Sequence, residues 1–258
     1  MSLDDPLRQR ALRMRLWGLV SRWDEVAHEP WVTALVEWEE EERRRRSLEY
    51  RIRQAKLDIF KPMADFDWAW PTKIDRGLVE DLFTCQFVDE AANVVLAGPS
   101  GVGKSTIALN LAYQALLRGY RVRYTQASDM LADLSAQEGS SSLTRALARY
   151  TAPHVLIVDE VGYLANADRA ADLLFEVVNR RYRKRPIILT TNRPFSEWGE
   201  VFPNAACVVT LVDRLVHKAE VVKIEGKSYR AKEAQERAAA KATIRKAPKP
   251  KKEDEPTP

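Results

Sequence analysis

The sequence is poor in the features that mark secreted, membrane-spanning or metal-binding proteins. It has two cysteines among 258 residues, Cys85 and Cys207, which lie far apart without the spacing of a metal or redox site. We expect both thiols to be reduced, although the sequence leaves a single disulfide open. No apolar run approaches the roughly eighteen residues of a membrane span, and arginines interrupt the apolar runs near the N-terminus, which argues against a signal peptide. We therefore expect a soluble, cytoplasmic protein without a membrane contact.

The chain also lacks a strong charge imbalance. Its 41 lysines and arginines against 37 acidic residues give a net charge of +4, which permits contact with nucleic acid without requiring it. With 45% hydrophobic and 30% charged residues, the composition is that of an ordinary globular protein. No internal repeat is visible, and the length suits one large domain with an appendage or two small domains.

One motif stands out against this plain background. Residues Gly98–Ser105 match the phosphate-binding loop Gly-x-x-x-x-Gly-Lys-[Ser/Thr], in which backbone N–H groups cradle phosphates. Lys104 would place a point charge on the β- and γ-phosphates, and Ser105 would offer its hydroxyl to Mg²⁺. An apolar strand-like run precedes the loop and a helical pattern follows it, as such a loop requires. We expect ATP to be bound by Gly98, Pro99, Ser100, Gly101, Val102, Gly103, Lys104, Ser105 and Thr106.

Three regions follow one another along the chain. Residues 1–66 look entirely helical, and we interpret them as an oligomerisation or partner module. Residues 67–232 alternate short β-type runs with helical patterns, which predicts an α/β fold with a parallel sheet covered by helices on both faces. These runs are Val94–Ala97, Val122–Thr125, Val155–Val158 and Ile187–Thr190. Residues 233–258 combine an Ala/Lys-rich helix with a basic, low-complexity tail that we expect to be disordered, because it cannot bury a core.

Helical spacing dominates the first region. One helix face is predicted by the rhythm of Leu12, Leu16, Leu19, Val20 and Trp23. Pro30 suits the opening turn of a second helix. Within it, the glutamates of the run Glu39–Arg46 each stand four residues before an arginine, which supports a long solvated helix. We favour this charged face over a nucleic-acid-binding arm, because the acidic half cancels the basic half.

Four of the seven tryptophans also fall in this region, at Trp17, Trp23, Trp31 and Trp38. A module this small cannot bury all of them deeply. Some could meet a partner or another subunit, where large aromatic side chains concentrate binding energy, or they could form a compact tryptophan-rich core. The sequence leaves both interpretations open.

Two further segments have the composition of a nucleotide site. The apolar run after His154 delivers Asp159 to the sheet edge beside the phosphate loop, where it could hold Mg²⁺. Glu160 follows, placed to polarise an attacking water. Asn192 ends the run that begins at Ile187, and in this order along the chain it predicts a γ-phosphate sensor.

The order of these motifs points to an AAA+ ATPase. A Leu-Ser-Gly-Gly-Gln signature of transporter ATPases is absent from the sequence. AAA+ proteins assemble so that an arginine of one subunit completes the site of its neighbour. Arg214, which precedes the β-type run Val221–Ile224, is our candidate for this finger, and a local pair with Asp213 is the alternative.

Several blocks together resemble the IstB family, the ATP-binding helpers that work beside the transposase IstA in two-gene insertion sequences. The resemblance runs from about Arg51 to Glu233 and is carried by Asp65–Trp68, Asp159–Leu164, Thr190–Phe202, Asp213–His217 and Gly226–Arg230. IstB proteins are similar to the helicase loader DnaC and the initiator DnaA. The tryptophan-rich start and the Lys-Pro tail have no firm match, which leaves the choice of partner in doubt.

The resemblance implies an AAA+ fold, a homo-oligomer with ATP sites between subunits, binding to duplex DNA, and delivery of target DNA to a cognate IstA-like transposase. Glu160, Lys104, Asn192 and Arg214 would be catalytic, and Ser105 and Asp159 would hold Mg²⁺. The family lacks much of the usual AAA+ lid, so we assign no second arginine sensor.

Three groups of basic residues could contact DNA. Two lie in the core: Arg180, Arg181, Arg183, Lys184 and Arg185 form one group, and Arg145 and Arg149 form the other. The first could instead serve a helix C-terminus, where the macrodipole favours cations. The third group is the tail cluster of Lys246, Lys249, Lys251 and Lys252, offset by acidic neighbours. No base-reading motif is present, so we expect contacts to the DNA backbone with little sequence preference.

Three functions remain in competition. The first is an ATP-dependent regulator of DNA transposition that oligomerises on and deforms target DNA, stimulates the transposase, and hydrolyses ATP to disassemble. A replicative helicase loader is the second, and its core motifs would be almost the same. The third is a metabolic kinase or a simple nucleotide-binding enzyme.

Overall fold

The protein is described by a computed structural model that covers residues 5–57, 59–162, 169–202 and 207–246. Within these residues, five parallel strands form one sheet in the order β2-β3-β4-β1-β5. The strands are β1 (Asn93–Ala97), β2 (Val122–Gln126), β3 (Val155–Asp159), β4 (Ile187–Thr191) and β5 (Ala219–Lys223). The α/β fold predicted from the alternation of patterns is confirmed, with each expected strand in place.

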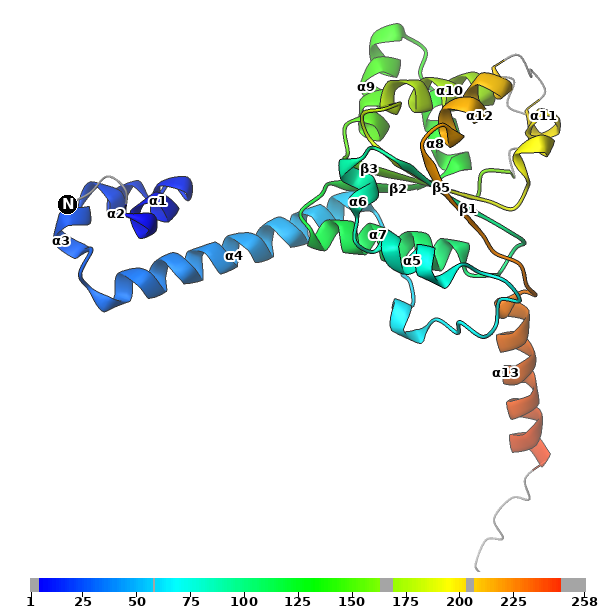
Figure 1. Cartoon of the computed structure of the whole chain (residues 1–258), viewed down its shortest axis with the longest axis horizontal. Helices are drawn as coiled ribbons and strands as arrows, with labels where there is room; N and C mark the ends of the chain where they lie inside the picture. The colour runs from blue at the N-terminus through cyan, green and yellow to red at the C-terminus, as the bar shows by residue number, and fades with distance from the viewer. Residues whose placement is uncertain (1–4, 58, 163–168, 203–206, 247–258) are drawn as a thin grey trace, which may run out of the picture.

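Helices cover both faces of the sheet, because successive side chains of each strand point to opposite sides. Val94 and Leu96 join a core with the helices α5 (Arg76–Leu82) and α7 (Lys104–Leu117), whereas Val95 joins the core on the other face. That second layer contains α8 (Ala127–Ser135), α9 (Ser140–Thr151), α10 (Ala170–Arg181) and α12 (Val208–Val216). Three shorter helical pieces complete the described core: α6 (Gln86–Asp89), η2 (Phe195–Glu197) and α11 (Trp198–Val201). Figure 1 shows the two helical layers above and below the sheet.

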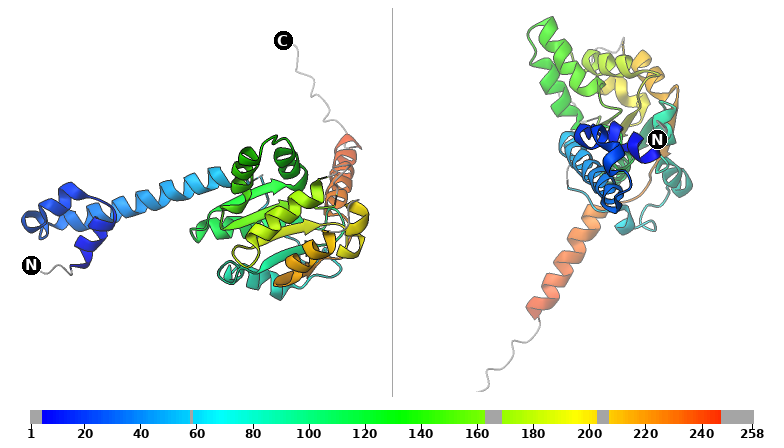
Figure 2. Two further views of the ribbon diagram at one scale, coloured as in Figure 1. Left: turned by 90° about the horizontal axis from the view of Figure 1, so that it is seen from above. Right: turned by 90° about the vertical axis from the view of Figure 1, so that its left-hand side faces the viewer.

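The helix α4 (Pro30–Ala55) extends from this core as a long rod and carries the N-terminal helices at its far end (Figures 1 and 2). Its last turns pack on the core through Leu48, Ile52 and Ala55. Three of the four predicted Glu-to-Arg pairs are present, as in Arg43 with Glu39, whereas Arg45 pairs with Glu42 and Glu49 in place of Glu41. The charged middle of α4 is therefore the solvated helix face that the sequence indicated.

The predicted single helix face over residues 12–23 is wrong. The chain forms three short helices instead: α1 (Pro6–Arg13), α2 (Trp17–Ser21) and α3 (Trp23–Val26). Arg15 ends the first with a left-handed φ of 58°. The bend lets Trp23 enter a small separate core against Val32 and Val36, where its indole N–H donates to Asp5 over 3.0 Å.

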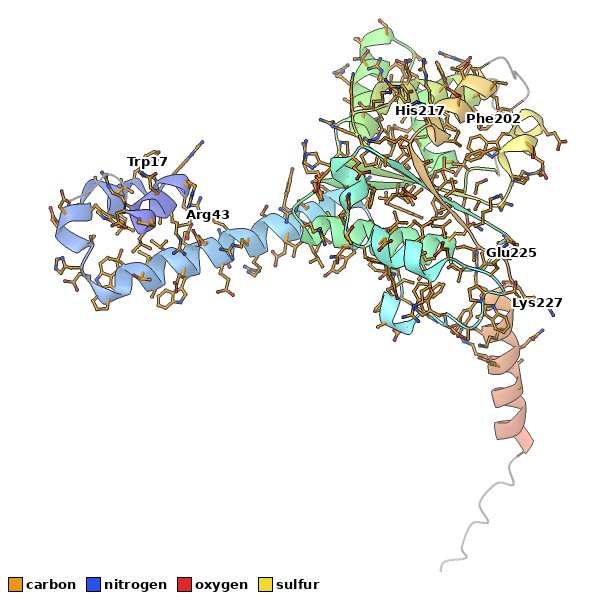
Figure 3. The ribbon with its side chains drawn as sticks, viewed as in Figure 1. Trp17, Arg43, Phe202, His217, Glu225 and Lys227 are labelled. Atoms are coloured by element: carbon orange, nitrogen blue, oxygen red, sulfur yellow. The ribbon has the colours of Figure 1, made fainter. Side chains whose placement is uncertain are left out.

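Of the four tryptophans of this module, one fits the interpretation of a compact core and three fit the interpretation of an exposed contact surface. Trp23 is buried, whereas Trp17, Trp31 and Trp38 are 61%, 48% and 66% exposed. Figure 3 shows Trp17 on the outer side of the module. The small core therefore uses one tryptophan and leaves three for solvent or a partner.

At the other end of the chain, α13 (Tyr229–Lys246) projects from the core after β5. Glu225 and Lys227 mark the segment where the chain turns from the sheet into this helix (Figure 3). The predicted disordered tail, with Lys249, Lys251 and Lys252, lies outside the described residues. Cys85 and Cys207 are both free thiols. Each helix of the described segments is too short or too polar to cross a bilayer.

Candidate nucleotide site

The phosphate-binding loop joins β1 to α7 at the carboxyl edge of the sheet. Gly103 has a left-handed φ of 100°, and a Cβ atom there would lie 2.5 Å from the ring of Phe66. At Gly98 a Cβ atom would lie 2.1 Å from the carbonyl oxygen of Ile224. Both contacts exclude a side chain, so these glycines allow the loop to pass between the segment before the core and the end of β5.

Lys104 is folded back onto its own loop. Its Nζ donates to the carbonyl oxygens of Gly98 and Pro99 at 2.7 and 2.6 Å. Burial lowers the pKa of this ammonium, although the carboxylates of Asp159 and Glu160 act in the opposite direction. An incoming phosphate would offer Lys104 a charged acceptor in place of two neutral carbonyls.

Asp159 ends β3 with a buried carboxylate that accepts hydroxyl groups. Its Oδ1 accepts from Ser105 at 3.0 Å and from Thr190, and its Oδ2 accepts from Tyr124 at 3.0 Å. The side chain is 3% exposed. The hydroxyl of Ser105 and the carboxylate are hard oxygen ligands of the kind that Mg²⁺ prefers, so the donor set fits this ion.

Glu160 and Asn192 face the space in front of the loop. Glu160 has a left-handed φ of 60°, and its N–H donates to Thr190 Oγ1 at 2.9 Å. This bend turns the chain away from β3 and leaves the carboxylate exposed. Among the described residues, the buried Oδ1 of Asn192 has no hydrogen-bond partner. A buried acceptor without a partner can accept a hydrogen bond from a donor that arrives with the ligand, such as a water molecule.

These groups line one cavity of about 410 Å³. Its lining includes the whole run Ser100–Thr106, together with Asp159, Glu160 and Asn192. Gly98 and Pro99 contribute through the carbonyls that hold Lys104. The loop, the Asp-Glu pair and the sensor candidate, which lie up to 94 residues apart in the sequence, are thus brought to one place.

The rest of the cavity wall comes from outside the sheet. Aromatic side chains enter from the segment before the core and from the start of α13: Phe60, Phe66, Trp70 and Tyr229. Asn110 of α7 holds the first segment in place, since its amide donates to Lys61 O and accepts from Met63 N, both at 2.9 Å. This segment contains the short helix η1 (Met63–Asp65). Apolar rings beside a phosphate loop provide a surface on which a nucleotide base can stack.

The family comparison agrees with this geometry. Residues 20–237 match the model of the IstB-like ATP-binding proteins. The chain belongs to this family. It is 32% identical to a Geobacillus stearothermophilus protein named as an ATP-binding protein of insertion sequence IS5376, over 86% of this chain and 92% of the relative. It is 39% identical to the Pseudomonas aeruginosa protein named likewise for insertion sequence IS21, over 74% of this chain and 72% of the relative.

Solved structures show the same fold at low sequence identity. A replication initiator DnaA bound to AMPPCP and single-stranded DNA aligns with a TM-score of 0.55 and 20% identity, over 72% of this chain and 56% of that one. The structure of DnaI aligns with a TM-score of 0.51 and 18% identity, over 63% of this chain and 90% of that one. The IstB-like protein is therefore an ATP-binding protein with an AAA+ fold.

Arg214, the candidate finger, does not belong to the cavity of its own chain. It lies on α12 and donates to Asn179 of α10, with its guanidinium 4.8 Å from the ring centre of Phe175 and 5.6 Å from that of Tyr182. The described residues that line the nucleotide cavity do not include it. The alternative, a local pair with Asp213, is not among the ion pairs of the described residues, and the side chain is held by α10.

The prediction that Arg181 contacts DNA is wrong, because this residue is buried. Its side chain is 1% exposed, and burial lowers its pKa to about 9, which keeps it charged at neutral pH. The guanidinium donates to backbone carbonyls of Tyr150, Thr151, Pro153, His154 and Pro186. Arg181 is therefore a buried link between the end of α9 and the residues that lead into β3 and β4, and it cannot reach a DNA phosphate.

The other basic residues of the two core groups differ in whether their side chains already have hydrogen-bond or ion-pair partners. Arg145 and Lys184 are exposed. Arg183 is exposed as well, but its guanidinium lies 3.5 Å from His217 Nε2 and 5.2 Å from the ring centre of Tyr182. Three arginines already have acceptors: Arg149 pairs with Asp133 at 2.7 Å, Arg180 pairs with Glu176 at 2.6 Å, and Arg185 donates to two carbonyls at the end of α9. Arg145 and Lys184 are therefore the best placed members of the two core groups for contact with DNA phosphates.

Arg230 and Tyr124 are among the cavity residues that the sequence did not indicate. Arg230 lines the cavity, and its motif Gly226–Arg230 was the signal that could have found it. Tyr124 lines the cavity as well, but a tyrosine in an apolar strand run carries no such signal.

Proposed function

We propose that this chain is an ATP-hydrolysing regulator of DNA transposition that assembles on duplex DNA, deforms it and recruits a cognate IstA-like transposase. The observation that carries the proposal is the division of the site. One chain supplies the phosphate loop, the acidic pair and the sensor asparagine to its cavity, whereas Arg214 lies elsewhere on the surface of the second helical layer. Such a division is expected where a neighbouring subunit completes the site.

Each residue has a distinct part in the proposed chemistry. Lys104 and the loop N–H groups bind the β- and γ-phosphates, and Arg230 adds a cation from the same chain. Ser105 and Asp159 would hold Mg²⁺, which neutralises charge that develops on the transferred phosphoryl group. Glu160 accepts a proton from the attacking water, and the unpaired Oδ1 of Asn192 orients that water. Arg214 of a neighbouring subunit contributes its guanidinium to the phosphoryl oxygens.

The membership of the family supports the transposition role, since the relatives are named for insertion sequences. The proposed DNA contacts are the exposed cations Arg145, Arg183 and Lys184, which would touch phosphates rather than bases. ATP closes the interfaces between subunits, and hydrolysis releases the assembly.

Electron microscopy of the Glu160→Gln variant with ATP and duplex DNA tests this function. We expect a discrete oligomer that encloses or bends the DNA, and we expect the Lys104→Ala variant to give no such particle. Free monomers of Glu160→Gln under these conditions would overturn the assembly. A pull-down with the full chain tests the partner, since retention of a replicative helicase in place of the transposase would reassign the protein as a helicase loader.

A further inference from the structure

The Asp159 carboxylate is held on two sides by groups from different strands. Thr190 of β4 donates to Oδ1, and Tyr124 of β2 donates to Oδ2 over 3.0 Å. Both partners of the tyrosine bond are buried, since Tyr124 is 7% exposed and Asp159 is 3% exposed. β2 lies beside β3 in parallel register, with Tyr124 opposite Ile157. The phenol thus reaches the carboxylate from the neighbouring strand, across the carboxyl edge of the sheet.

The donors to Asp159 are not equivalent. Ser105 is itself a proposed ligand of Mg²⁺, so its bond to Oδ1 at 3.0 Å is one that ligand binding would exchange. Tyr124 and Thr190 have no place in the metal donor set. Their hydroxyls can stay with the carboxylate whether or not nucleotide is bound. Such bonds fix the direction in which a carboxylate presents its remaining lone pairs.

We propose that Tyr124 is a positioning residue for Asp159 and thereby sets the Mg²⁺-dependent part of nucleotide binding. The inference rests on the proposed role of Ser105 and Asp159 as the residues that hold Mg²⁺. A phenylalanine at this position would keep the ring packing but would leave Oδ2 without the phenolic donor in a buried setting. The carboxylate would then be free to rotate toward other donors, and the geometry offered to the ion would be lost.

The chain offers a matched control in Tyr150. This tyrosine is also buried, at 3% exposure, and its hydroxyl also donates to a carboxylate, Asp133, at 2.6 Å. Tyr150 lies on α9 and is not among the described residues that line the nucleotide cavity. Tyr150→Phe therefore removes the same kind of hydrogen bond at a distance from the site.

The experiment measures the dissociation constant of a fluorescent ATP analogue for the full chain, once with Mg²⁺ and once with EDTA. We expect Tyr124→Phe to weaken binding about tenfold more with Mg²⁺ than in EDTA, as loss of a residue behind a metal ligand commonly does. Tyr150→Phe should leave the ratio of the two constants at the wild-type value. The ratio is also insensitive to partial unfolding, which lowers the active fraction in both arms alike.

Two outcomes separate the inference from its basis. If wild-type binding does not respond to Mg²⁺, the proposed metal role of Ser105 and Asp159 fails, and the inference fails with it. If the wild type responds and Tyr124→Phe responds equally, or if Tyr124→Phe weakens binding equally in both arms, Tyr124 does not position Asp159.

Discussion

Lys232, in the first turn of α13, donates to Asp67 over 3.0 Å and so joins two segments that are 165 residues apart. The same ammonium lies 4.5 Å from the ring centre of Trp70. Lys61 and Glu233 form a second ion pair between the same two segments. Lys61, Asp67 and Glu233 all line the nucleotide cavity, so the pairs fasten the start of α13 to the cavity wall.

We predict that Asp67→Asn speeds the release of bound nucleotide. The hydrogen bond from Lys232 lowers the pKa of Asp67, so the carboxylate is charged at neutral pH and its loss breaks the ion pair. Because the pair is partly exposed, we expect about a two- to fivefold faster rate in stopped-flow displacement, and less in high salt. The exchanged pair, Asp67→Lys with Lys232→Asp, should return the rate toward wild type. No change in Asp67→Asn would mean that the Lys232–Asp67 pair does not retain nucleotide.

A second prediction concerns the division of the site between subunits. Lys104→Ala should remove ATP binding from the chain that carries it, because the phosphates lose their point charge. Arg214→Ala should leave binding nearly intact but remove hydrolysis in a neighbour. The two inactive variants are mixed in varying ratio and ATPase activity is measured. Since intact half-sites then meet at some interfaces, partial recovery of activity is expected. A mixture as inactive as its components would place Arg214 outside the shared site.

Arg181 should matter for stability and not for DNA. Replacing it by methionine leaves several buried carbonyl oxygens without a donor, so we expect the free energy of unfolding to fall by about 3 kcal/mol in urea titrations. Arg180→Met is the control on the same helix, and it should cost less than about 0.5 kcal/mol, because Arg180 has an exposed pair with Glu176. Equal effects from the two variants would contradict the structural role of Arg181.

The exposed cations should appear in the salt dependence of DNA binding. Each phosphate contact contributes about 0.9 to the slope of log affinity against log salt. We therefore expect Lys184→Ala and Arg145→Ala each to reduce this slope by about one, with equal effects on unrelated DNA sequences. Arg43→Ala, in the part of α4 that extends away from the core, should leave the slope unchanged. A slope unaffected by both core variants would move the DNA contact to another surface.

The sequence predicted the sheet and located the proposed phosphate side of the site, for a local reason. A phosphate-binding loop needs a strand, a run of fixed residues and a helix in immediate succession, and all three are visible between Asn93 and Leu117. Parallel strands then bring their carboxyl ends to one edge. Asp159, Glu160 and Asn192 could therefore be placed from the ends of their apolar runs.

The pattern failed where a local turn or a distant partner decided the outcome. Residues 12–23 have the spacing of one helix, but the left-handed turn at Arg15 and the bond from Trp23 to Asp5 divide them. Arg181 has the sequence context of a surface cation. Carbonyls that come together only in the folded state take up its guanidinium instead.

The sequence by itself determined the family and the AAA+ fold and located the proposed phosphate-binding residues, because each is carried by short motifs whose residues lie close together in the chain. Tertiary structure alone decided that Tyr124 holds Asp159, that Arg230 and α13 border the nucleotide cavity, and that Arg214 lies apart from it. The contacts behind these relationships join residues that are 35 to 165 positions apart in the sequence. Their geometry follows from strand order and helix packing, which no local pattern encodes.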